Sequence, residues 1–187
     1  AGNFNNHIGL PLTLLKLTGA HRYAVIEMGM SHFGELAQLT QIARPDVALV
    51  NNALRAHVGC GFDGVGDIAK AKSEIYQGLN ADGLALIPCE DANAAVFQTA
   101  SKAFKQHTFG VGQGDIHAEN IVLQPLSCAF DLVRGGERAA VLLPVPGKHN
   151  IHNAVAAAAL ALAAGLRLQE VSDGLQSFAN IKGRLQI

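Results

Sequence analysis

Residues 47–76 read VALVNNALRAHVGCGFDGVGDIAKAKSEIY, and this stretch decides the fold. It begins with an apolar run, 47–50, whose length and β-branched residues are typical of a strand buried on both faces. A glycine-rich loop over 59–66 follows, and the pattern over 68–76 then predicts a helix. In an open α/β sheet, ligands bind beyond the carboxyl ends of the strands. His57 and the start of this helix are therefore predicted to lie at a binding edge.

The same alternation of strand, loop and helix extends to both sides of this stretch. Upstream, the run YAVIEM at 23–28 predicts a buried strand, and a helix is predicted over 35–43. Downstream, strands are predicted at 83–88 and 107–111, with a helix over 91–104 between them. This alternation favours an α/β fold with a mostly parallel, twisted sheet flanked by helices.

The pattern changes after residue 115. Three strand-like runs follow one another without a helix between them: 116–123, 128–133 and 139–145. Gly135-Gly136 is typical of a hairpin turn, so a small antiparallel sheet is predicted there. The remaining helices are predicted over 12–17, 154–164 and 169–178.

Size and composition indicate one cytosolic, reduced domain. The chain has 187 residues and a formal net charge of −1, which gives no sign of binding to nucleic acid or an anionic membrane. Its three cysteines have no metal-ligand spacing, and no apolar run reaches the length of a membrane span. Because the sequence starts without Met, a fragment of a longer cytoplasmic protein is predicted.

Polar residues near the predicted strand ends are candidates for a cation and phosphate site. Glu27 lies in an apolar run, where a carboxylate either pairs with a partner such as a metal ion or faces water at the strand end. Glu27, His57 and Lys72 map to one edge of the sheet and could together organise a hard cation and phosphates. The asparagines of the first loop favour either a capped turn or a contact with phosphate or sugar: Asn3, Asn5 and Asn6.

The two lysines of the central helix are predicted to differ. Lys70 and Lys72 point about 200° apart. Periodicity places Lys72 on the buried face, whereas Lys70 is predicted to form a solvated pair with Glu74 at i, i+4. Partial burial lowers the pKa of a lysine and favours the neutral amine, which reacts with carbon dioxide. The alternative is that both lysines are solvated.

Two glycine patterns do not fit phosphate-binding motifs. Gly147-Lys148 is followed by His149, where a phosphate-binding loop requires Ser or Thr. The glycines at 110, 112 and 114 miss the dinucleotide fingerprint, because the third comes one residue early and an extended segment follows. The chain therefore has no regular nucleotide motif.

Several segments taken together resemble the central ATPase domain of the Mur ligases, over essentially all of the chain. They are 3–11 (NFNNHIGLP), 25–29 (VIEMG), 51–57 (NNALRAH), 69–75 (AKAKSEI) and 146–154 (PGKHNIHNA). The first and fourth segments resemble the branch that adds D-Ala-D-Ala to UDP-MurNAc-tripeptide. The resemblance implies an ATP- and Mg²⁺-dependent, ADP-forming amide ligase of peptidoglycan precursor synthesis that works through an acyl phosphate.

The resemblance also implies roles for individual residues. Glu27 and His57 correspond to magnesium ligands, and Lys72 corresponds to a lysine that ligates the metal once it is carbamylated. The residues that correspond to nucleotide contacts are Asn150, Asn153 and Arg184. Those that match a loop near the muramoyl substrate are Asn3, Asn5 and Asn6.

Two departures from the family pattern affect the expected activity. The phosphate-binding loop would lie upstream of Ala1, with the amino-terminal domain for the uridine nucleotide, and the carboxy-terminal domain is also missing. Residues 58–62, after His57, form a loop that is one residue longer than usual and lacks a Glu. The fragment 1–187 alone is therefore predicted to be inactive. Another Mur or folylpolyglutamate-type amide ligase, or a non-catalytic binding module of the same fold, are the alternatives.

Overall fold

The structure is a computed structural model that describes residues 5–55, 59 and 61–178. These residues form a mixed six-stranded sheet, with strand order β1-β2-β3-β4-β5-β6, and flanking helices. The predicted α/β class is confirmed. The chain divides into two compact units, one of Ala1–Ile87 and Asp91–Gln106 and one of Pro88–Glu90 and His107–Ile187.

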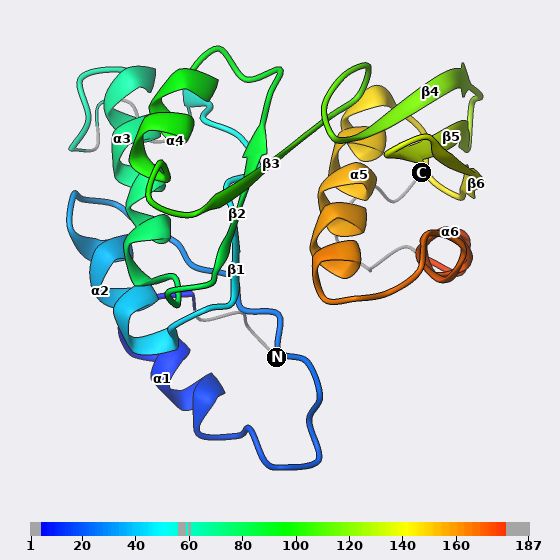
Figure 1. Ribbon diagram of the computed structural model, residues 1–187. Helices are drawn as coiled ribbons and strands as arrows, with labels where there is room; N and C mark the ends of the chain where they lie inside the picture. Colours follow the sequence, from blue (N-terminus) through cyan, green and yellow to red (C-terminus); the bar gives the residue numbers. More distant parts are fainter. Residues whose placement is uncertain (1–4, 56–58, 60, 179–187) are drawn as a thin grey trace. The chain divides into compact units, whose positions relative to one another are not determined.

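The first unit contains the strand–loop–helix stretch at 47–76. Its elements are α1 (Gly9–Leu14), α2 (Glu35–Ala43), β1 (Val47–Leu49), α3 (Val65–Ser73), a 3₁₀ turn (Glu74–Gly78), β2 (Leu84–Pro88) and α4 (Ala94–Ala100). β1 and β2 pair in parallel, with Val47 opposite Leu84, as predicted. Figure 1 shows α2, α3 and α4 together beside these strands. Ile68, Tyr76 and Phe97 are fully buried in the core between them.

The prediction of a strand at 23–28 is wrong. No strand is assigned to these residues, and Val25 is 86% exposed. Ile26 and Met28 do pack against the core of the first unit, so the apolar pattern serves packing without strand pairing. A strand is formed by hydrogen bonds to a neighbour, and β-prone residues alone do not supply one. The apolar pattern at 23–28 therefore indicates residues that pack against the core, but it does not identify their secondary structure.

Helix bounds also differ from their predictions. α2 spans 35–43 as predicted, whereas α3 begins three residues early at Val65 and gives way to the 3₁₀ turn at Glu74. Gly78 ends that turn against α2, where a Cβ would lie 2.2 Å from the carbonyl oxygen of Thr40. A side chain at this position would therefore separate α2 from the turn.

The second unit contains the predicted antiparallel sheet. Its elements are β3 (Lys105–Gly110), of which the first two residues belong to the first unit, β4 (Ile116–Leu123), β5 (Cys128–Arg134), β6 (Glu137–Leu143), α5 (Lys148–Ala163) and α6 (Leu168–Gln176). β4, β5 and β6 pair antiparallel, and the turn at Gly135-Gly136 has φ values of 54° and 90°. Both are values that glycine adopts readily, which explains the hairpin.

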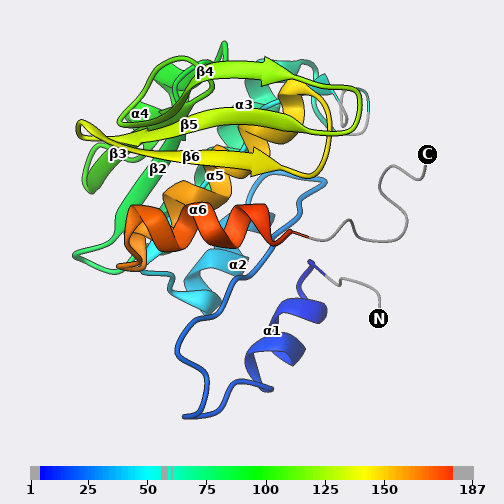
Figure 2. The ribbon, with the colours of Figure 1, turned by 90° about the vertical axis from the view of Figure 1, so that its right-hand side faces the viewer.

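Two helices cover the antiparallel sheet. Figure 2 shows α5 behind β4–β6 and α6 alongside β6. Ile151 and Val155 of α5 are fully buried, and Ser172 Oγ of α6 donates to the carbonyl oxygen of Ala140 at 2.6 Å. α5 begins six residues before the predicted start at Ala154. Within the described part of the chain, no helix has both the length and the apolar character needed to cross a membrane.

Candidate functional site

Lys72 reaches from α3 to the backbone that follows β1. Its side chain is half-buried, and Nζ donates a hydrogen bond to the carbonyl oxygen of Asn52 at 2.7 Å. Burial lowers the pKa of Lys72, while the negative charge of Asp91 acts in the opposite direction. A lowered pKa raises the fraction of neutral amine, which is the form that acts as a nucleophile.

Lys70 has a different environment, as helical periodicity predicts. It is exposed, and its Nζ donates to the carboxylate of Asp67 at 3.2 Å, one turn back on the same helix. The predicted pair of Lys70 with Glu74 is wrong. The α-helix ends at Ser73, so Glu74 belongs to the 3₁₀ turn and leaves the i, i+4 geometry.

Glu74 instead binds the amino terminus of α2. Its two carboxylate oxygens accept hydrogen bonds from the backbone N–H of Gly34 at 2.8 and 2.9 Å, and Ala37 N–H donates to one of them at 3.4 Å. The first N–H groups of a helix lack intrahelical partners and attract negative charge. Glu74 therefore ties the helix of Lys72 to the loop that follows Glu27.

Asp91 is a polar residue of this region that sequence reasoning missed. One carboxylate oxygen accepts from the backbone N–H of Ala53 at 2.7 Å, and the other accepts from Asn93 N and Nδ2 at 2.8 and 3.2 Å. Asp91 follows β2 just as Asn52 follows β1. The rule that ligands bind beyond the carboxyl ends of parallel strands would have identified it if applied to both strands.

Glu27 lies near the first loop of the chain. Its carboxylate is exposed and accepts a hydrogen bond from Asn5 Nδ2 at 3.1 Å. The backbone carbonyl oxygen of Asn5 also accepts from Gly29 N–H at 2.8 Å. A Cβ on Gly29 would lie 2.8 Å from Nδ2 of the Asn5 side chain. Asn6 Oδ1 accepts from the N–H groups of Ile8 and Gly9 at 3.1 and 3.0 Å. Asn6 thus closes the turn that leads into α1, whereas the Asn5 side chain is directed to Glu27.

The metal site predicted from Glu27, His57 and Lys72 is only partly covered by the structure. His57, Asn3 and Arg184 lie outside the described residues. Among the residues that are described, no group of three His, Cys, Asp or Glu side chains is placed to hold a metal ion. The carboxylate oxygens of Glu27 are of the type that Mg²⁺ prefers, and the amine of Lys72 is not. A carbamate on Lys72 would supply oxygen ligands.

Asn150 and Asn153 belong to the second unit. Both lie in the first two turns of α5, and Asn150 Nδ2 donates to the carbonyl oxygen of Pro146 at 2.7 Å. Gly147 precedes the helix with a φ of 97°. Asn150 therefore fixes the turn into α5, and Asn153, three residues further on, lies exposed on a neighbouring part of the helix surface.

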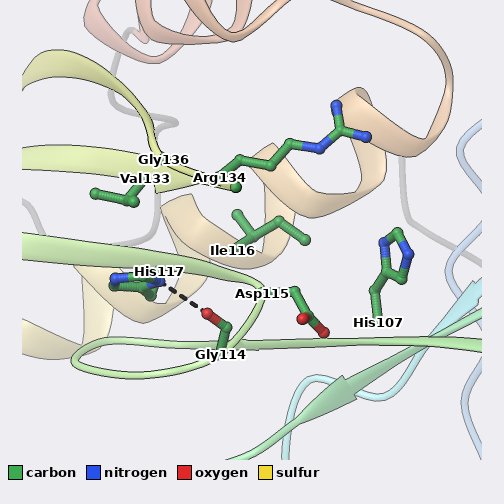
Figure 3. Close-up of a pocket in the computed structure, with 9 residues that line it drawn as sticks. His107, Gly114, Asp115, Ile116, His117, Val133, Arg134 and Gly136 are labelled. Atoms are coloured by element: carbon green, nitrogen blue, oxygen red, sulfur yellow. Dashed lines mark hydrogen bonds between the residues drawn. The ribbon is translucent and has the colours of Figure 1, made fainter.

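A hollow of about 450 Å³ in the second unit holds none of the predicted site residues that the structure describes. Its lining includes His107, Asp115, His117 and Arg134 (Figure 3). His117 is bonded through Nδ1 to the carbonyl oxygen of Gly114 at 2.8 Å, and Asp115 accepts from Thr108 N and Oγ1 at 2.7 and 2.8 Å. The hydrogen bonds of these polar groups hold the loop between β3 and β4 in place.

Comparison with known sequences gives a family and named relatives. Residues 1–161 match the model of the Mur ligase middle domain. UDP-N-acetylmuramoyl-tripeptide–D-alanyl-D-alanine ligase of Haemophilus influenzae is 40% identical over 185 residues, which are 98% of this chain and 40% of that protein. The ligase of the same name from Escherichia coli K12 is 41% identical over 187 residues, 99% of this chain and 41% of its own length.

Solved structures agree in fold. A crystal structure of MurF from Acinetobacter baumannii superposes with a TM-score of 0.94 at 41% identity and covers 100% of this chain and 41% of that one. MurF of Thermotoga maritima in complex with ADP gives a TM-score of 0.83 at 24% identity, over 98% of this chain and 42% of that one. The chain thus spans about two fifths of the length of these relatives.

Proposed function

Because the chain belongs to the Mur ligase family through the middle domain, we propose that it is the ATP-binding central part of an ADP-forming amide ligase. The complete protein would join D-Ala-D-Ala to UDP-MurNAc-tripeptide in the cytoplasm, during synthesis of peptidoglycan precursors. Residues 1–187 would form the central domain. The parts that lie outside this chain in the relatives would supply the phosphate-binding loop, the site for the uridine nucleotide and the site for the incoming amine.

The reaction expected of such a ligase has two stages. ATP first phosphorylates the terminal carboxylate of the tripeptide and leaves as ADP. The amine of D-Ala-D-Ala then attacks the acyl phosphate, and its nitrogen–carbon bond forms as phosphate departs and a proton is lost. Phosphoryl transfer needs positioned charges and donors more than covalent help from the protein. The residues of this chain would therefore act by positioning and by charge.

Lys72 is the residue on which this proposal depends most. Its neutral amine would attack carbon dioxide, form a nitrogen–carbon bond and lose one proton, which gives a carbamate. The support is its half-buried position, with Nζ held by Asn52 at 2.7 Å and a pKa lowered by burial. Lys70 on the same helix is exposed and paired with Asp67. Only Lys72 of the two meets the conditions for this chemistry.

Glu27 and the carbamate of Lys72, with His57, would hold Mg²⁺. Bound there, the ion would neutralise charge on the phosphate oxygens. Glu27 would supply carboxylate oxygen, and Asn5 would orient it through the 3.1 Å hydrogen bond. Through this pairing, the loop of Asn5 and Asn6 would link substrate binding to the metal ligand. In the second unit, Asn153 would contact adenine, and Asn150 would fix the start of α5 for that contact.

The complete protein offers a direct test by substrate specificity. With ATP and Mg²⁺, phosphate release should require both UDP-MurNAc-tripeptide and D-Ala-D-Ala, and the product should have the mass of the pentapeptide. The alternative functions are tested by replacing D-Ala-D-Ala with L-Ala, D-Glu or a diamino acid, or by supplying glutamate with a folyl acceptor. Reaction with one of these substrates, and not with D-Ala-D-Ala, would assign the chain to another amide ligase. No reaction with any pair would favour a non-catalytic module.

A further inference from the structure

We propose that Asp91 is a positioning residue that holds a single peptide group, between Asn52 and Ala53, in place to receive Lys72. This inference deepens the proposed function and rests on it, because it concerns how the amine of Lys72 is oriented. Asp91 lies in the loop after β2, the peptide group follows β1, and Lys72 lies on α3. One short chain of hydrogen bonds therefore connects three elements of the first unit.

The two hydrogen bonds meet on the same planar unit. Asp91 Oδ2 accepts from Ala53 N–H at 2.7 Å, and Lys72 Nζ donates to Asn52 C=O at 2.7 Å. This C=O and this N–H belong to one amide, which is planar and resists rotation about its C–N bond. The peptide cannot turn about its flanking bonds without breaking both contacts. The orientation of the acceptor of Lys72 is therefore tied to the Asp91 carboxylate.

Charge strengthens this arrangement. A carboxylate that accepts from the N–H end polarises the amide and makes its carbonyl oxygen a better acceptor. Ala53 is 5% exposed, so water has little access to replace a lost partner. The second oxygen of Asp91 accepts from Asn93 N and Nδ2 at 2.8 and 3.2 Å, which fixes the carboxylate itself. Asp91 acts on Lys72 through the peptide, in addition to the direct effect of its charge on the amine, and Asn93 keeps Asp91 in position.

Two substitutions separate the hydrogen bond from the charge. Asp91→Ala removes the acceptor of Ala53 N–H altogether. Asp91→Asn keeps an amide oxygen that can accept the same bond but carries no charge. Asp67→Ala is the matched control, since that carboxylate pairs with Lys70 on the exposed side of α3. All variants are made in the complete protein, and each is measured for amide exchange at Ala53 and for ligase kinetics.

We expect Asp91→Ala to speed exchange of the Ala53 amide at least tenfold and to lower kcat at least tenfold, with the KM values for UDP-MurNAc-tripeptide and D-Ala-D-Ala within twofold. Asp91→Asn should recover most of both losses, and Asp67→Ala should change neither. In a Lys72→Ala background, Asp91→Ala should have less than a twofold further effect on kcat, because both residues act through one contact.

Three results would overturn the inference. Unchanged Ala53 exchange in Asp91→Ala would show that the carboxylate does not hold the peptide. Faster exchange with normal kcat would show a purely structural role. Additive losses with Lys72→Ala would show that Asp91 acts elsewhere. Failure of the proposed function is distinguishable, because it would appear as absence of the ligase reaction in the unsubstituted protein, and it would overturn this inference as well.

Discussion

Removal of the Glu74 carboxylate should loosen the start of α2, because Glu74 is the partner of its amino-terminal N–H groups. Both oxygens accept from Gly34, and one also accepts from Ala37. Glu74→Ala leaves these donors without a protein partner in a half-buried place. Glu74→Gln retains one oxygen acceptor and loses the charge.

The expected size of the effect follows from these contacts. A hydrogen bond to a charged group contributes about 1.5–3 kcal/mol, and a carboxylate at a helix amino terminus adds about 0.3–1 kcal/mol. Water reaches this half-buried site, so the lower end applies, and Glu74→Ala should cost about 2 kcal/mol. Glu74→Gln should cost about half of that. A destabilisation of 2 kcal/mol lowers Tm by roughly 4–8 °C in a protein of this size.

Native-state hydrogen exchange is the appropriate assay, because two compact units need not unfold together. The amide of Gly34 should exchange more than tenfold faster in Glu74→Ala, since about 1.4 kcal/mol corresponds to tenfold. Lys70→Ala, on the exposed side of the neighbouring helix α3, is the control and should change stability by less than about 0.5 kcal/mol. Equal exchange at Gly34 in Glu74→Ala and the unsubstituted protein would refute the reasoning.

Two further predictions concern packing and pH. Gly78→Ala should destabilise the first unit by about 3 kcal/mol or more, because its Cβ would meet the α2 backbone at 2.2 Å from Thr40 O; a urea midpoint equal to that of the unsubstituted protein would contradict this. Burial lowers the pKa of folded Lys72, so the unfolded chain binds the proton more tightly and stability should rise with pH between the lowered value and about 10.4. Lys72→Met should abolish that rise and Lys70→Met should not, and a rise that persists in Lys72→Met would assign it to another group.

The parts of the fold that sequence could predict depend on local patterns. α2 has an apolar face at helical spacing, and the glycine pair at 135–136 supplies the positive φ values that a tight hairpin needs. The separation of Lys70 and Lys72 follows from the helical period alone, and their burial agrees with it. Each of these features is determined by residues within a few positions of one another.

The features that sequence missed depend on distant partners. Asp91 bonds Ala53 across 38 positions, and Glu74 bonds Gly34 across 40. Residues 23–28 have strand-like composition, but no strand is assigned to them. Hydrogen-bond partners so far apart are selected by tertiary packing, which periodicity does not encode. The prediction that Glu74 pairs with Lys70, which came from helical spacing alone, is wrong for this reason.

The central claim is that Lys72, and not Lys70, supplies the amine that forms a carbamate in an ATP-dependent ligase. Its most direct test is the rate of D-Ala-D-Ala ligation by Lys72→Ala and Lys70→Ala in the complete protein, with and without a short carboxylic acid such as acetate. We predict a loss of about a hundredfold or more for Lys72→Ala, partial rescue by the acid in place of the carbamate, and a rate within twofold for Lys70→Ala. Equal losses in the two variants, or full activity in Lys72→Ala, would contradict the account.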